Sequence, residues 1–158
     1  MAAPPWSVLL AAAAFIVGAD QWVKAVITRS IPPGSSVPVI SGLISLTHVQ
    51  NRGVAFGLMA GISPILMTLA ALTLIVLLSY NKGRRTWSRA SSLGFALMVG
   101  GAIGNLLDRI RFGFVVDYLD VHVWPVFNLA DAAIVTGAGL VLLVLMRSGP
   151  GADSEVRA

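Results

Sequence analysis

The chain has 158 residues, of which 56% are hydrophobic and only 11% charged, and its mean hydropathy is +0.84. This composition is too apolar for a soluble domain of the same size and indicates a single membrane-embedded domain. The net charge of +4 does not indicate nucleic-acid binding, because four of the eleven cations fall in one short loop, and the absence of cysteine excludes a disulfide framework, a thiol nucleophile and a thiolate metal site.

Four stretches are long and apolar enough to cross a bilayer, which takes roughly 20 mostly apolar residues. They cover about residues 7–27, 63–80, 90–107 and 129–146. We expect the first to be a retained helix, because no basic residue precedes Lys24 and no small-residue cleavage site follows the apolar run. The sequence therefore predicts a mainly α, polytopic membrane protein with one domain over residues 1–147 and a polar, disordered tail over residues 148–158.

The loop between the second and third stretches indicates how the chain is oriented in the membrane. It contains no acid and four cations, Lys82, Arg84, Arg85 and Arg89. The positive-inside rule places such a loop in the cytoplasm, and four spans then place both termini there too. The other ends of the helices, with the polar residues they carry, are expected at the outer face.

Five of the seven acidic residues lie in or beside these apolar segments: Asp20, Asp108, Asp117, Asp120 and Asp131. A carboxylate near the hydrocarbon is costly, so each is a candidate functional residue. Simpler interpretations stay open for some of them. Asp20 and Lys24 have the i,i+4 spacing of a structural ion pair, Asp131 could interact only with a helix dipole, and Asp120 is expected to be a solvated charge.

The two outer connections differ in composition. Residues 31–50 begin with Pro32 and Gly34 in a turn-forming run and continue with a β-branched, polar mixture that predicts short strands on the membrane surface. Residues 111–127 are rich in aromatic and branched side chains, and we expect this connection to rest as a loop in the membrane interface near the acids.

Paired carboxylates are the chemistry best supplied by this sequence. It contains no Gly-x-Ser-x-Gly element and no glycine-rich phosphate loop, and its two histidines, His48 and His122, are interpreted as interface residues. Two aspartates held close together share a proton, so that one can activate water while the other donates a hydrogen bond. Asp117 and Asp131 suit this role best, because Asp117 lies in the connection directly before the helix that starts near Asp131.

Three motifs give the chain a specific resemblance. Residues 104–109 read Gly-Asn-Leu-Leu-Asp-Arg and are followed by Val-Val-Asp-Tyr at 115–118, residues 127–131 read Phe-Asn-Leu-Ala-Asp, and residues 51–56 read Asn-Arg-Gly-Val-Ala-Phe. In this order they resemble the lipoprotein signal peptidases (signal peptidase II), which are bacterial membrane aspartyl proteases. The resemblance implies that Asp117 and Asp131 are the catalytic dyad. It also implies supporting roles for Asp20, Lys24, Asn51, Gly53, Asn105, Asp108, Arg109, Asn128 and Ala130.

The resemblance further implies an architecture and a substrate. The family has four transmembrane helices, a small β-cradle on the outer membrane surface and an outer loop over the site. Its members cut diacylglyceryl-modified prolipoproteins just before the lipidated cysteine, without a metal or cofactor. The implied partners are these prolipoproteins, membrane lipid and cyclic peptide inhibitors of the globomycin type, and the implied location is the bacterial cytoplasmic (inner) membrane, with the active site at its outer face.

Two other classes remain as alternatives to a peptidase. A proton-coupled carrier could use the embedded acids as a relay, although the acids gather at one face and no span is broken by an internal polar stretch. A lipid-headgroup enzyme could use the aspartates as Mg²⁺ ligands, although its acids would be expected on the cytoplasmic side.

Overall fold

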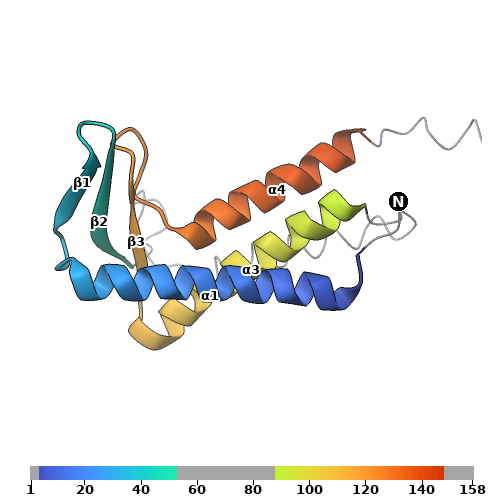
Figure 1. The fold of residues 1–158 in the computed structure, drawn as a ribbon, viewed down its shortest axis with the longest axis horizontal. Helices are drawn as coiled ribbons and strands as arrows, with labels where there is room; N and C mark the ends of the chain where they lie inside the picture. The colour runs from blue at the N-terminus through green and yellow to red at the C-terminus, as the bar shows by residue number, and fades with distance from the viewer. Residues whose placement is uncertain (1–3, 53–87, 148–158) are drawn as a thin grey trace, which may run out of the picture.

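The computed structural model describes residues 4–52 and 88–147, which form a mainly helical structure with a small antiparallel sheet at one end of the helices (Figure 1). The predicted span at residues 63–80, Gly53 and the predicted tail at residues 148–158 lie outside this part of the chain.

Three predicted spans are confirmed as helices, each slightly longer than expected. They are α1 (Trp6–Ser30), α3 (Arg89–Phe112) and α4 (Leu129–Arg147). Of these, α1 and α3 are long and apolar enough to cross a membrane. Helix α3 continues past the predicted boundary until Gly113, whose φ of 75° is the left-handed conformation that commonly ends a helix.

Glycines allow the helices to approach one another closely. A Cβ atom on Gly94 of α3 would lie 2.7 Å from the carbonyl oxygen of Gly137 on α4, and one on Gly100 would lie 2.8 Å from the carbonyl oxygen of Ala13 on α1. Both distances are shorter than a Cβ contact can be. Small residues at such crossings let backbones pack directly, as is common in membrane helix bundles.

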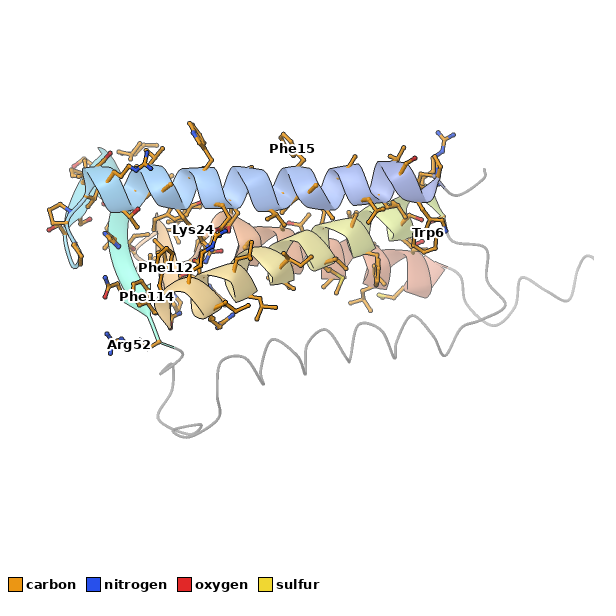
Figure 2. The ribbon with its side chains drawn as sticks, turned by 90° about the horizontal axis from the view of Figure 1, so that it is seen from below. Trp6, Phe15, Lys24, Arg52, Phe112 and Phe114 are labelled. Carbon is orange, nitrogen blue, oxygen red and sulfur yellow. The ribbon has the colours of Figure 1, made fainter. Side chains whose placement is uncertain are left out.

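Helix α1 presents an apolar surface away from the other helices and polar side chains toward them, the reverse of a water-soluble helix. Phe15 is 72% exposed and points away from the other helices, whereas Lys24 is 3% exposed and points in among them (Figure 2). Asp20, one turn before Lys24, is fully buried. An apolar surface around a polar interior is the arrangement expected for a protein whose solvent is lipid.

The sheet has the order β1-β2-β3, with all neighbours antiparallel. Strands β1 (Ser36–Ile40) and β2 (Ile44–Asn51) confirm the strands predicted between residues 31 and 50. Strand β3 (Val115–Asp120) was not predicted, since residues 111–127 were expected to be a loop in the interface. Its β-branched residues pair with β2, so that part of this apolar connection is buried by the sheet.

A small apolar core joins the sheet to the end of α1. Ile27 of α1 and Ile31, the residue directly after that helix, pack with Val116 and Tyr118 of β3, and all four side chains are buried. Because Val116 and Tyr118 flank Asp117 on β3, the packing holds that aspartate close to the polar turns of α1.

Candidate active site

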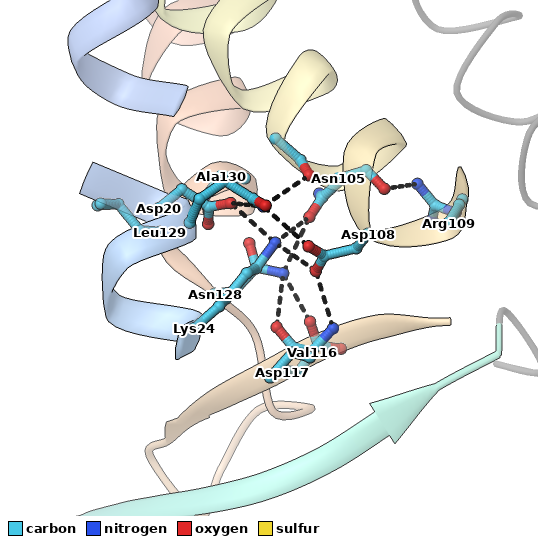
Figure 3. A network of polar contacts seen from close by, with 12 residues as sticks. Asp20, Lys24, Asn105, Asp108, Arg109, Val116, Asp117, Asn128, Leu129 and Ala130 are labelled. Carbon is cyan, nitrogen blue, oxygen red and sulfur yellow. Dashed lines mark hydrogen bonds and ion pairs between the residues drawn. The ribbon is translucent and has the colours of Figure 1, made fainter. Parts of the chain in front are cut away.

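Polar side chains gather where the three helices meet the sheet (Figure 3). The buried members come from α1, α3, β3 and the residue preceding α4, and each is at most 5% exposed. They are Asp20, Lys24, Asn105, Asp108, Asp117 and Asn128. Residues far apart in the sequence are thus brought into one cluster.

Lys24 lies at the centre of this cluster. Its Nζ is 2.9 Å from a carboxylate oxygen of Asp20, which confirms the expected i,i+4 pair, and 2.9 Å from one of Asp108. It also donates a hydrogen bond of 3.0 Å to Asn105 Oδ1. A buried charge needs such partners, because an uncompensated one is strongly destabilising.

The two carboxylates that pair with Lys24 each hold a backbone N–H group as well. Asp108 Oδ2 accepts from the N–H of Val116 at 3.1 Å, and Asp20 Oδ1 accepts from the N–H of Ala130 at 3.0 Å. Val116 and Ala130 are the residues directly before Asp117 and Asp131. The ion-pair cluster therefore positions the backbone immediately before both predicted catalytic aspartates.

Asp117 is 2% exposed and accepts two side-chain hydrogen bonds. One comes from Asn51 Nδ2 at 2.8 Å and the other from Asn128 Nδ2 at 2.7 Å. Burial raises the pKa of the Asp117 carboxyl to about 6, and the nearby charge of Asp131 acts in the same direction, against the effect of the two amide donors. This carboxyl therefore holds a proton more readily than an ordinary aspartate.

Asp131 is positioned by the cap of helix α4. Asn128, the residue before α4, accepts from the N–H of Asp131 at 2.9 Å, and its own N–H donates to Asp131 Oδ2 at 3.2 Å. This reciprocal pair has the form of a capping box. Asp131 Oδ1 also accepts from Asn105 Nδ2 at 2.7 Å.

The amide of Asn128 connects the two aspartates. Its Nδ2 lies within hydrogen-bonding distance of Asp117 Oδ1 and, at 3.1 Å, of Asn105 Oδ1, while Asn105 binds Asp131. Asn128 and Asn105 thus form a bridge between the carboxyl groups, which come from different elements.

Gly104 and Arg109 lie next to the cluster on α3. A Cβ atom on Gly104 would lie 2.7 Å from Asp20 Oδ2, so the buried carboxylate needs a glycine at this position. Arg109 Nη1 donates to the carbonyl oxygen of Asn105 at 3.4 Å. Of the predicted site residues, only Gly53 falls outside the part of the chain that the structure describes.

Two residues that sequence reasoning did not select also contact the cluster. Gln21 Nε2 donates to Asp108 Oδ1 at 2.8 Å, and the Tyr118 hydroxyl accepts from the N–H of Leu129, the first residue of α4, at 3.2 Å. Burial raises the pKa of Tyr118 to about 12, so the hydroxyl stays neutral. Both residues adjoin predicted aspartates in the sequence, but their partners are set by the tertiary structure.

Asp120 differs from the solvated charge that was expected. Its side chain is 20% exposed and accepts from the N–H of His122 at 2.8 Å and from Thr47 at 3.2 Å. His122 in turn contacts Ser45 at 3.2 Å. These contacts tie the connection after β3 to the sheet, where the backbone of His122 adopts a φ of 61°. The other histidine, His48, is buried rather than interfacial and binds the carbonyl oxygen of Ile31 at 2.7 Å.

Comparisons with known proteins identify the family of this chain. A family model described as signal peptidase (SPase) II matches residues 12–147. The lipoprotein signal peptidase of Halothermothrix orenii is 45% identical over 126 residues, covering 80% of this chain and 86% of that protein. That of Syntrophomonas wolfei is 45% identical over 134 residues, covering 85% and 89%.

The fold is likewise similar to that of solved membrane enzymes. One structure, described as a bacterial membrane enzyme determined by the in meso method at 2.3 Å resolution, superposes with a TM-score of 0.77 at 25% identity and covers 93% of this chain and 92% of that one. A second, determined by the same method at 1.9 Å, gives a TM-score of 0.76 at 26% identity. By its matched family model and its relatives, the chain belongs to the signal peptidase II family.

Proposed function

We propose that this protein is an aspartic endopeptidase that removes the signal peptide from diacylglyceryl-modified prolipoproteins by cutting just before the lipidated cysteine. The observation that carries the proposal is the meeting of Asp117 and Asp131 in one cluster, joined through Asn128 and Asn105. The family supports the reaction class, and its relatives are named for the lipoprotein substrate.

In the proposed mechanism the two carboxyl groups share one proton. The ionised member takes a proton from water as the water oxygen attacks the scissile amide carbon. The protonated member donates a hydrogen bond to the carbonyl oxygen, and a proton passes to the leaving nitrogen as the C–N bond breaks. The raised pKa of Asp117 favours a proton held by the pair, whose titration belongs to both carboxyl groups together.

The supporting residues have positioning roles in this proposal. Asn51 and Asn128 orient the Asp117 carboxylate, and Asn105 orients that of Asp131. The group formed by Asp20, Lys24 and Asp108 holds the backbone before each aspartate, at Ala130 and Val116. Arg109 holds the turn of α3 that carries Asn105, and Gly53 belongs to the same set through its motif alone.

The proposal places the reaction at the edge of a bilayer. Four transmembrane helices over residues 1–147 would carry the cluster at the outer face of the bacterial inner membrane, with both termini cytoplasmic and the sheet on the outer surface. The exposed apolar side chains of α1 and the buried polar cluster at its C-terminal half support this setting. Inhibition by cyclic peptides of the globomycin type would follow from the same site.

The lipid on the substrate has a physical role in this arrangement. A diacylglyceryl group fixes the depth of the adjacent peptide bond at the membrane surface, where the aspartates are proposed to lie. Burying acyl chains contributes about 0.8 kcal/mol for each methylene group. We therefore expect an unlipidated precursor peptide to be a very poor substrate, and comparable turnover of the two peptides would contradict this role of the lipid.

The proposal is tested by cleavage of a lipidated precursor peptide in detergent with excess chelator, comparing wild type with Asp117→Asn and Asp131→Asn. We expect cleavage just before the lipidated cysteine by wild type and at least about a thousandfold lower kcat for each variant. Asp120→Asn is the matched control, because Asp120 is a third aspartate of the same region that binds the sheet instead of the cluster. Loss of cleavage with chelator, or near-normal turnover by either dyad variant, would overturn the assignment.

A further inference from the structure

Gln21 connects the surface of the protein to the buried cluster. Its Nε2 donates to Asp108 Oδ1 at 2.8 Å and also lies 3.2 Å from the carbonyl oxygen of Gly104 and 3.3 Å from Asp20 Oδ2. Its Oε1 accepts from Nη1 of Arg111 at 3.0 Å. Arg111 is exposed and lies in the last turn of α3, whereas Gln21 is partly buried on α1.

Arg111 and the buried acceptors favour the same orientation of the Gln21 amide. A glutamine amide has donors only on its nitrogen and acceptors only on its oxygen, and a guanidinium group can only donate. With Arg111 bound to the oxygen, the NH₂ group faces the two carboxylates. The reversed amide would place its oxygen against those carboxylates and its NH₂ group against the guanidinium, so both sets of contacts would become repulsive.

Asp108 transmits this orientation to the proposed catalytic residue. Its carboxylate is 1% exposed, with Oδ1 bound to Gln21 and Oδ2 bound to the N–H of Val116 and to Lys24. Removing the Gln21 amide takes away the donor that lies 2.8 Å from Oδ1 of this buried carboxylate. The carboxylate can then rotate away from Val116, the residue directly before Asp117.

We propose that Arg111 and Gln21 are positioning residues for the peptidase reaction, acting in series through Asp108 and the Val116 N–H to hold Asp117 in its reactive position. The inference rests on the proposed catalytic role of Asp117. Arg111 is exposed and lies outside the three motifs, and the inference is that it nevertheless affects the rate of the chemical step.

The test is a double-mutant cycle on cleavage of a lipidated peptide in detergent, with kcat and KM measured separately from pH 5 to pH 8. Gln21→Met keeps the length of the side chain and removes the amide, and we expect it to lower kcat about tenfold while KM changes less than about twofold. Arg111→Met should lower kcat about threefold. Arg111→Lys should keep kcat near that of wild type, because a lysine can also donate to Gln21 Oε1. Both Gln21→Met and Arg111→Met should shift the pH profile of kcat/KM.

The decisive outcome is the behaviour of the double variant. If Arg111 acts through Gln21, adding Arg111→Met to Gln21→Met lowers kcat no further. Arg29→Met is the matched control, since Arg29 is an exposed arginine in the last turn of α1, two turns from Gln21, and its kcat and pH profile should equal those of wild type.

Several results would overturn the inference. They are unchanged kcat and pH profile in Arg111→Met, multiplicative losses in the double variant, or a failure of Arg111→Lys to restore the rate. Should Gln21→Met not fold, the Arg111 variants decide the question alone, because Arg111 is at the surface. Asp117→Asn is run in the same assay. If it stays active the proposed dyad fails, and if it is inactive while the Gln21 and Arg111 variants match wild type, only the positioning role fails.

Discussion

The contact between α3 and α4 is made by different groups along its length. In the N-terminal half of α3, Gly94 faces Gly137, and backbone meets backbone with no room for a side chain. In the C-terminal half, Asn105 binds Asp131 and Asn128 through side-chain amides. The first half of this contact is sensitive to added volume. The second half, where Gly101 also packs against the backbone of Ala130, is sensitive in addition to the loss of a hydrogen-bonding partner.

The difference follows from what each half has to do. Lipid tails are as apolar as leucine, so helices in a bilayer gain little from burying apolar surface and associate through close packing of small residues. A reactive site instead needs polar groups, and each buried polar group must be paired. Close packing of small residues therefore runs along both halves of the contact, whereas the proposed chemistry is confined to the second.

The largest loss of stability and activity is expected from removing Lys24, the cation at the centre of the polar cluster. Lys24→Met leaves Asp20 and Asp108 buried without their shared partner, and we expect a loss of about 3–5 kcal/mol in the free energy of unfolding together with loss of cleavage. Chemical unfolding in detergent measures the effect, with Arg29→Met as the exposed control on the same helix. A loss below about 1 kcal/mol would show that the cluster does not depend on this charge.

An added methyl group should destabilise the protein at Gly137, which packs against α3, but not at Gly139 on the same helix. Gly137→Ala forces a Cβ atom against Met98 and the backbone of Gly94, and we expect a destabilisation of about 1–3 kcal/mol. Gly139→Ala, on the same helix, meets nothing within 4 Å and should instead stabilise slightly through its helix propensity. Thermal unfolding of the two variants compares them directly, and equal shifts in Tm would contradict the close packing.

The pH dependence of cleavage should report the protonation of Asp117. Its raised pKa means that the shared proton is present below about pH 6 and is lost as the pH rises through that value. We expect kcat/KM to fall toward a tenfold decrease for each further pH unit on this limb, with an apparent pKa that belongs to the coupled pair. A flat kcat/KM between pH 5 and pH 8 would contradict a shared proton.

The smallest effect is expected where the sheet meets α4. Tyr118→Phe removes the hydroxyl that accepts from the Leu129 N–H but keeps the ring packed on Ile27 and Ile31. We expect a loss of about 1 kcal/mol in stability and a decrease of a few fold in kcat, because the first turn of the helix that carries Asp131 loses a contact. Tyr118→Leu should cost more, since it also removes the ring, and equal values for the two variants would show that the hydroxyl has no role.

Part of the site could be predicted from local sequence alone. The i,i+4 spacing of Asp20 and Lys24 predicted their ion pair, and the motifs selected Asp117 and Asp131 for one site. In contrast, Asp120 looked like a solvated charge, and residues 111–127 looked like a loop, because nothing local to them shows that β2 supplies Thr47 and a strand partner. Gln21 was passed over for the same reason, since its partners Asp108 and Arg111 lie on another helix.

The sequence by itself determined the membrane class, the three described helices, the first two strands and the set of aspartates, because apolar length, turn residues and the cost of an embedded charge are properties of short segments. Only the tertiary structure decided that Lys24 pairs with two carboxylates, that each of these holds the backbone before a proposed catalytic aspartate, and that β3 completes the sheet. Those contacts join residues up to 110 positions apart, and which of them form depends on how the glycines let the helices approach.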